Sequence, residues 1–521
     1  MNPRWVKTDL WSRLTLGFIV AATGVGAGDL LTASLAGSAV GVSILWAAWV
    51  GAWLKFVLNE GLARWQMATG QSILEGWFCH LPRFFPWLFF VYFFLWAFYV
   101  GGALINACGV AGVGFFSLGH PGLARIIWGI AHSLAGLFFV WRGGFPLFQR
   151  LMSFLTAGMV LTVLISVIRV SPSWLKVLPG LVVPTFPSQG SSWLLGVMGG
   201  VGGTVTIICY NYWVREKGRK GLEGLKECRL DLSVGYGLTA FFGLAMIIIG
   251  SKIVVKGRGD EVALQLAEKL GEVLGPAGKG LFLLGFWSAV FSSLLGVWQG
   301  VPYIFADFLR LRRATQPKGI INGGKVEGQK ISTKVPSSLP QGLTSKISTQ
   351  PVSLPASLFS SSPGALTVPP PFAPSTSSTS LSPSNNSASG KDVDSSTLSI
   401  DSNSSDDKFA PSSPRKVTKT AGQDLHRSLA YRLFLLGLTF LPLISLFFTV
   451  QRIQLVYAVL GALFMPFLAA TLLILNNRKD LVPRSFRNTW VINLCLWVNL
   501  IFFSYLGWRE LRPLFSSLFK F

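Results

Sequence analysis

The sequence predicts an all-α polytopic membrane protein with about 11 transmembrane helices. Of its 521 residues, 51% are hydrophobic and only 13% are charged, whereas a soluble globular chain averages about 25% charged residues. With 40 Phe and 19 Trp besides, too little polar surface remains to cover a water-facing exterior. Uninterrupted apolar stretches of about 20 residues, the length that crosses a bilayer, also recur along almost the whole chain. These observations predict a chain that is embedded in a lipid bilayer.

The predicted spans fall into two groups, eight within residues 1–313 and three within residues 426–521. In chain order they run near 14–38, 43–66, 84–112, 122–141, 147–170, 190–213, 231–252, 278–307, 430–450, 454–476 and 488–508. The loops after even-numbered spans are rich in Lys and Arg, and such loops face the cytoplasm. The sequence therefore predicts a multi-pass protein of the plasma (cytoplasmic) membrane with its N-terminus in the cytoplasm.

The positive charge fits this orientation and does not indicate a nucleic-acid partner. The net charge is +23, but the basic residues form short clusters between apolar runs and no basic helix stands apart from the spans. The 5 Cys are odd in number and form no CxxC pair, and the 4 His are scattered. Neither a disulfide framework nor a zinc site is expected from them. Because no nucleophile–base pair presents itself either, we expect neither an enzyme nor a bound cofactor.

Residues 314–425 differ in composition from the rest of the chain. They are dominated by Ser, Pro, Thr, Gly and Asn, and such a segment cannot bury enough apolar area to offset the entropy of ordering it. We expect a disordered cytoplasmic insertion between the eighth and ninth spans. Two interpretations stay open, a tether that binds a cytoplasmic protein partner and an insertion that is merely tolerated.

Closely spaced glycines followed by polar side chains interrupt two of the spans. The residues concerned are, in span one, Gly24, Gly26, Gly28, Asp29 and Thr32, and, in span six, Gly199, Gly200, Gly202, Gly203, Thr204 and Thr206. Glycines can serve close helix packing alone, whereas a broken helix at membrane depth must be buried or line a cavity. The two spans are five apart, so in two repeats of five spans the breaks correspond. Paired breaks of this kind predict a substrate site near the bilayer midplane of a secondary transporter.

Asp29 is the only carboxylate deep inside a predicted span. A charge at the bilayer centre costs at least about 2.5–3.5 kcal/mol, so it implies a partner or a water-filled cavity. An ionised Asp beside freed backbone carbonyls offers the oxygen ligands that suit a hard cation. The predicted substrate-binding residues, all from the two broken spans, are Asp29, Gly26, Thr32, Gly203, Thr204 and Thr206.

Several of these segments resemble the Nramp divalent-metal transporters. The resemblance is carried by AGSAVGVSILW, from the end of span one to the start of span two, by GGTVTIICYNYWVREKG in span six and by FWSAVFSSLLGVWQGVPYIFADFL in span eight. It covers nearly all of the chain outside the insertion. The resemblance implies a LeuT-like fold of two inverted five-helix repeats with broken helices 1 and 6. It also implies transport of a divalent metal cation, the substrate, by alternating access.

The chain departs from the family's metal motifs. Where the family has Asp-Pro-Gly-Asn in span one, this chain has a segment that begins at Gly26 and ends at Asp29. In span six, Thr206 and Ile208 stand where the family has a methionine and a histidine. Loss of the thioether removes the preference for soft metals, since oxygen ligands suit Mg, Ca and Mn. Similar losses occur in the family's magnesium-transporting relatives, and a hard ion such as Mg or Mn is therefore favoured.

Two other functions remain open on the same sequence. The first is a transporter of an amino acid or another small solute on the same fold, in which a helix N-terminus holds the carboxylate of the substrate and Asp29 its ammonium group. The second is a non-transporting membrane sensor or scaffold whose working part is the insertion. A panel of metals and amino acids tested for thermal stabilisation would separate the three.

Deletion of residues 330–415 should leave transport within a few-fold of that of the full chain. This stretch has no apolar periodicity with which to pack against a helical bundle, and both of its ends are predicted on the cytoplasmic side. Uptake into proteoliposomes measures the effect. Complete loss of uptake by a correctly inserted deletion variant would show that the insertion takes part in transport.

Overall fold

Helices account for the regular secondary structure in the described residues, in agreement with the predicted fold class. The computed structural model describes residues 3–116, 118–170, 174–186, 191–200, 202–252, 262–315 and 425–518. The helices are α1 (Pro3–Gly24), α2 (Ala27–Val40), α3 (Leu45–Thr69), α4 (Ile73–His80), α5 (Phe84–Phe115), α6 (Pro121–Val170), α7 (Trp174–Val182), α8 (Ser191–Gly200), α9 (Cys209–Glu216), α10 (Gly221–Gly250), α11 (Val262–Thr315), α12 (Leu429–Phe440), α13 (Val450–Leu475) and α14 (Trp490–Leu518).

The long helices agree with the predicted spans. Eight helical stretches among the described residues are long and apolar enough to cross a bilayer. One of them, α6, has Gly144 at a φ of 59°, and this kink divides it into the predicted spans 122–141 and 147–170. The predicted first and sixth spans are each divided into two helices, α1 with α2 and α8 with α9. The described helices are thus compatible with eleven spans, two of them broken.

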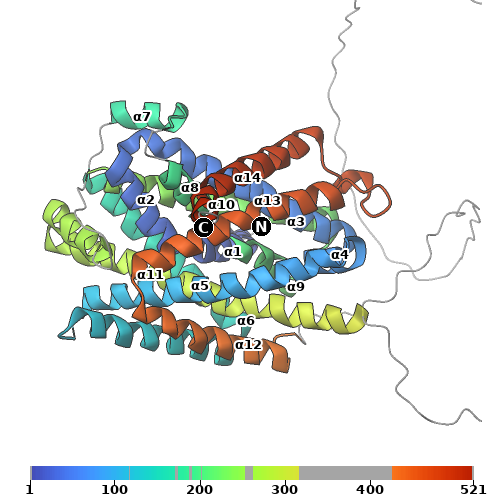
Figure 1. Cartoon of the computed structure of the whole chain (residues 1–521), viewed down its shortest axis with the longest axis horizontal. Helices are drawn as coiled ribbons and strands as arrows, with labels where there is room; N and C mark the ends of the chain where they lie inside the picture. The colour runs from blue at the N-terminus through green and yellow to red at the C-terminus, as the bar shows by residue number, and fades with distance from the viewer. Residues whose placement is uncertain are drawn as a thin grey trace, which may run out of the picture. The chain divides into compact units, whose positions relative to one another are not determined.

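The broken spans pack against helices from distant parts of the chain. α1 contacts α6, α10 and α11, while α8 contacts α2, α3 and α13. Figure 1 shows α5, α6, α11 and α12 side by side, and α13 lies next to α14. Each half of a broken span is therefore held by unbroken helices.

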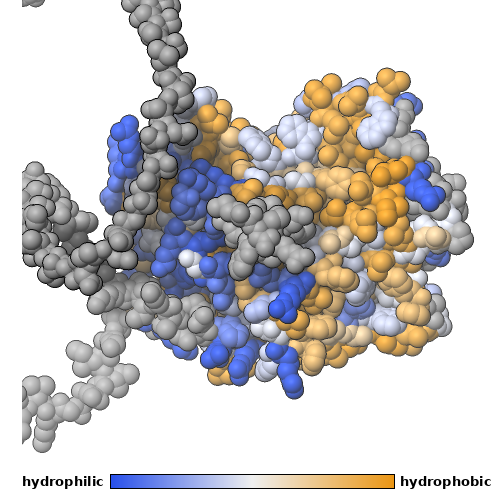
Figure 2. Space-filling view, turned by 180° about the vertical axis from the view of Figure 1, so that it is seen from behind, coloured by the Kyte–Doolittle hydropathy of each residue, from blue (hydrophilic) through white to orange (hydrophobic). Residues whose placement is uncertain are grey.

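Apolar side chains cover much of the exterior. Large hydrophobic residues such as Phe154, Ile168, Trp490 and Trp508 are exposed. Figure 2 shows a broad apolar area on one face, with hydrophilic residues gathered toward one side of it. An apolar area of this extent marks a surface that contacts protein or membrane rather than water. Together with the apolar helices, it identifies a multi-pass membrane protein.

The described residues belong to one compact unit, made of Met1–Gly319 and Lys416–Phe521. Residues 316–424, nearly all of the predicted insertion, lie outside the described residues. The division of the chain at residues 314 and 425 accordingly stays a prediction.

α2 and α10 pack so closely that glycine is needed where they touch. A Cβ placed on Gly250 would lie 2.1 Å from the carbonyl oxygen of Ser34, and one on Gly37 would lie 2.2 Å from that of Ile247. Small residues permit this approach between membrane helices. The tight contact fixes α2, the second half of the first span, against an unbroken helix.

Gly250→Ala should therefore lower the melting temperature of the detergent-purified protein, because the added methyl group meets backbone atoms that cannot move aside. We expect a loss of about 1–3 kcal/mol of stability, as for other overpacked sites. Gly237→Ala is the matched control, since a Cβ at Gly237 on the same helix meets nothing within 4 Å. A Gly250→Ala variant that melts as high as the Gly237→Ala variant would contradict this packing argument.

Candidate functional site

The first break lies between α1 and α2, and side chains of α11 satisfy the backbone that it frees. Val25 donates the last helical hydrogen bond of α1, to Ala21. The hydroxyl of Ser292 donates to the carbonyl of Ala22 (3.2 Å), and the hydroxyl of Ser293 donates to the carbonyl of Thr23 (3.0 Å). Carbonyls at a helix end have no donors within the helix. The serines supply them at a depth where water is scarce.

The second break lies between α8 and α9. Gly202 and Gly203 have φ angles of 92° and 77°, in the left-handed region that residues with a Cβ rarely adopt. The 3-10 turn Val205–Ile208 then leads into α9. The unwinding leaves the last carbonyls of α8 in need of donors from elsewhere.

The two breaks touch each other. A Cβ placed on Gly24 would lie 2.9 Å from the carbonyl carbon of Gly202, and one on Gly203 would lie 3.5 Å from the Cα of Gly24. Backbone approaches backbone here, so a side chain at Gly24 would force the segments apart. The interruptions that the sequence paired by their spacing are in contact in the folded chain.

A small cavity, with room for about one water molecule, adjoins these breaks. Its lining includes Thr23 and Gly24 from span one, Gly202 and Thr206 from span six, and Asn59 from α3. The hydroxyl of Thr23 and the amide oxygen of Asn59 are buried and have no hydrogen-bond partner among the described residues. Leaving such a group unsatisfied costs about 1–3 kcal/mol. The arrangement offers oxygen atoms to a small polar ligand.

The structure brings three of the predicted site residues to the breaks. Gly26 lies beside Ser293, since a Cβ on it would be 2.9 Å from the serine hydroxyl oxygen. Gly203 lies closer still to Thr206, with 2.5 Å between a Cβ on Gly203 and the threonine hydroxyl oxygen. Thr206 is buried and lines the cavity.

The other three predicted residues are placed differently. The hydroxyl of Thr204 accepts a hydrogen bond from the indole of Trp96 in α5 (2.8 Å), so it is already engaged. The methyl group of Thr32 packs against Gly196 of α8, in the helix before the second break. Asp29 lies in the first turn of α2, and its side chain is outside the described residues.

Two polar residues of α3 at this site were missed by the sequence analysis. Lys55 is fully buried, and its ammonium group donates a 2.7 Å hydrogen bond to the carbonyl of Gly199, in the last turn of α8. Asn59, one turn further along α3, donates to the hydroxyl of Tyr236 (3.2 Å) and lines the cavity. The available signal was a lysine inside the apolar run WVGAWLKFVLN. The sequence analysis considered only carboxylates inside the predicted spans, so this lysine was not identified.

A network of charged groups ties α9 to its neighbours beyond the second break. Glu75 of α4 forms ion pairs with Arg215 of α9 (2.7 Å) and with Arg310 of α11 (2.5 Å). Arg310 also pairs with Asp307, which accepts a hydrogen bond from the hydroxyl of Tyr212. Burial raises the pKa of Glu75, but the two arginines outweigh it and hold the pKa below its ordinary value. The carboxylate is thus charged at neutral pH.

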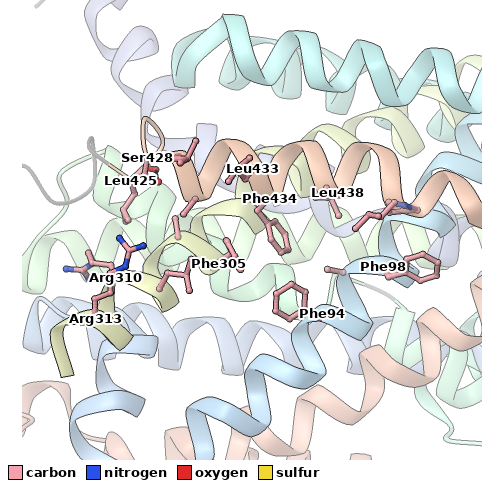
Figure 3. Close-up of a pocket in the computed structure, with 18 residues that line it drawn as sticks. Phe94, Phe98, Phe305, Arg310, Arg313, Leu425, Ser428, Leu433, Phe434 and Leu438 are labelled. Carbon is pink, nitrogen blue, oxygen red and sulfur yellow. Dashed lines mark hydrogen bonds between the residues drawn. The ribbon is translucent and has the colours of Figure 1, made fainter. Parts of the chain in front are cut away.

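A larger cavity lies elsewhere, between α5, α11 and α12. It measures about 880 Å³ and is walled mainly by apolar side chains, among them Phe94, Phe305 and Phe434. Figure 3 shows Arg310 and Arg313 together at one end, and Arg310 is already held by carboxylates. No residue of the broken spans is among those that line it. Its position and lining separate it from the candidate substrate site.

The sequence is similar to one known protein family. The family described as natural resistance-associated macrophage protein-like (Nramp) matches residues 17–321. No curated protein is similar enough in sequence to match the chain.

The fold is similar to that of a manganese transporter from Eremococcus coleocola. A structure of a mutant of that protein aligns with a TM-score of 0.60 at 14% identity, covering 100% of this chain and 90% of the other. Its complex with an aromatic bis-isothiourea substituted compound aligns with a TM-score of 0.59 at the same identity and coverage. At this level of identity the likeness establishes the fold alone.

Glu75→Gln should destabilise the protein at pH 7 by about 1–3 kcal/mol, because it leaves Arg215 and Arg310 without their shared carboxylate. The folded-state pKa of Glu75 is depressed, so its contribution is complete above the ordinary value of about 4.3 and disappears as the pH falls through the folded pKa. Melting temperatures of the wild type and the variant should therefore converge at acidic pH.

Glu223→Gln provides the matched control, since Glu223 pairs with Lys226 at an exposed site and such pairs contribute little. A Glu75→Gln variant that melts like the wild type at pH 7 would show that the network does not hold α9 in place.

Proposed function

The chain belongs to the natural resistance-associated macrophage protein-like (Nramp) family, and on this premise we propose that it transports a divalent metal cation across the membrane by alternating access. A hard ion such as Mg or Mn is the favoured substrate. The proposal is carried by one observation, the contact between the two broken spans beside a small cavity with oxygen atoms in its wall. In this reading the protein is a transporter and not an enzyme.

The ligand chemistry supports a hard ion. The lining residues with side-chain oxygens are Thr23, Asn59, Thr206, Tyr210 and Tyr236, and none of the lining residues carries sulfur. Hydroxyl, amide and carbonyl oxygens suit Mg and Mn, whereas thioether sulfur suits softer metals. Asp29, at the start of α2, would add the negative charge. The proposed ligand set is therefore Asp29 with hydroxyl and backbone oxygens near Gly26, Gly203 and Thr206.

Alternating access requires that the helices on one side of the site move relative to the rest of the bundle. The pairs formed by Glu75 with Arg215 and Arg310 hold α9 to α4 and α11. We propose that this network is the closed gate on one side of the site and that it separates when that side opens. The distribution of Lys and Arg in the loops supports a plasma-membrane location in which the network of Glu75, Arg215 and Arg310 lies on the cytoplasmic side. The insertion, in this orientation, is available there to a protein partner.

Uptake into proteoliposomes tests the proposal. The wild type should take up Mg²⁺ or Mn²⁺ down a gradient, and Asp29→Asn should abolish uptake while the melting temperature stays within a few degrees. The loss follows because the variant removes the fixed negative charge of the site. Asp480→Asn, which changes an exposed carboxylate paired with Arg478, is the matched control and should transport normally.

Two results would overturn the proposal. One is a wild type that moves neither metal, and the other is unchanged uptake by the Asp29→Asn variant. Thermal stabilisation of the wild type by amino acids but by neither metal would favour solute transport instead.

A further inference from the structure

Lys55 is the only lysine among the described side chains that is fully buried. It lies near the middle of α3, within a stretch that is apolar enough to cross a bilayer. An ammonium group at that depth is strongly disfavoured unless a partner compensates it. Its position therefore needs an explanation beyond packing.

One partner of Lys55 is the end of a broken helix. Lys55 donates to the carbonyl of Gly199 (2.7 Å), in the last turn of α8. The C-terminal end of a helix carries partial negative charge and unsatisfied carbonyls, both of which favour a cation. The aliphatic part of Lys55 also follows the break, since its Cδ lies 3.4 Å from a Cβ placed on Gly202.

Lys55 also lies next to the oxygen-lined cavity. Gly202, which its side chain approaches, is one of the lining residues, and so is Asn59, one turn away on the same face of α3. Carbonyls at the ends of broken helices are the groups that transporters of this architecture offer to cations. At the end of α8 one of these carbonyls is engaged by a cation that belongs to the protein.

We propose that Lys55 determines ion specificity, its ammonium group being a built-in cation that competes with the transported metal for the carbonyl end of α8. This inference rests on the proposed function. A divalent ion entering the site either displaces the ammonium group or binds beside it, and in both cases it meets electrostatic opposition that grows with the charge of the ion. Lys55 thus keeps metal binding weak and release rapid.

The experiment compares metal binding by purified full-length variants. Lys55→Gln retains a hydrogen-bond donor for Gly199 without the charge, and Lys55→Met removes both. Each should lower the Mg²⁺ and Mn²⁺ concentrations that give half-maximal thermal stabilisation by at least about tenfold. The gain should be smaller for Li⁺, because a single charge is repelled less. Lys226→Met, at an exposed ion pair, should leave the midpoints unchanged, and Lys55→Arg should bring them back toward the wild type.

The outcomes separate the inference from the proposed function. A wild type that binds and transports metal, with Lys55→Gln binding no more tightly, overturns the role of Lys55 and leaves the transporter standing. Failure of every variant and of the wild type to bind metal overturns both. A gain of equal size for Li⁺ and Mg²⁺ would also overturn the inference, since it would reflect altered packing and not charge. If Lys55→Met does not fold, Lys55→Gln alone decides.

Discussion

Contact between two unwound backbone segments is the constraint on which much of this structure depends. Gly24 and Gly202 approach so closely that a side chain on Gly24 would collide with the backbone of the other segment. Unwinding frees carbonyls that water cannot satisfy at membrane depth. Ser292 and Ser293 of α11 supply donors to α1, and Lys55 of α3 supplies one to α8. The break thus determines which neighbouring helices must carry polar residues, and where.

The need to satisfy backbone polar groups inside a bilayer explains why so much of the fold could be predicted. Apolar runs of bilayer length predict helices, because a helix satisfies all of its backbone hydrogen bonds within one segment of the chain, and the bilayer core supplies no water to satisfy them. Glycine spacing then distinguishes two runs from the rest, and both are broken in the folded chain. Gly144 kinks α6 between two predicted spans. These features follow from the local sequence and from the surrounding bilayer, without knowledge of contacts between residues far apart in the chain.

The site could be predicted only in part, because its contacts join residues far apart in sequence. Gly203 and Thr206 meet across a short turn, which local spacing indicates. Nothing near Thr204 in the sequence reveals that the indole of Trp96 in α5 donates a hydrogen bond to its hydroxyl. Thr32, chosen because it follows the glycines, lies more than one turn into α2, and its methyl group packs against α8. The polar residues of α3 were missed for the same reason, since their partners become visible only in three dimensions.

The two breaks correspond in position but not in charge. Neutral hydroxyl groups satisfy the carbonyl end of α1, whereas an ammonium group satisfies that of α8. A hydroxyl can donate to a carbonyl and still present its oxygen to a metal ion, whereas an ammonium group has no lone pair and can only repel one. On the proposed function, a cation between the breaks is drawn away from the end of α8. It is drawn toward Asp29, in the first turn of α2, and toward the oxygens of Thr23 in α1 and Asn59 in α3, which have no hydrogen-bond partner among the described residues. The inverted repeats provide a symmetric frame, and the placement of one buried lysine makes the proposed binding site within it asymmetric.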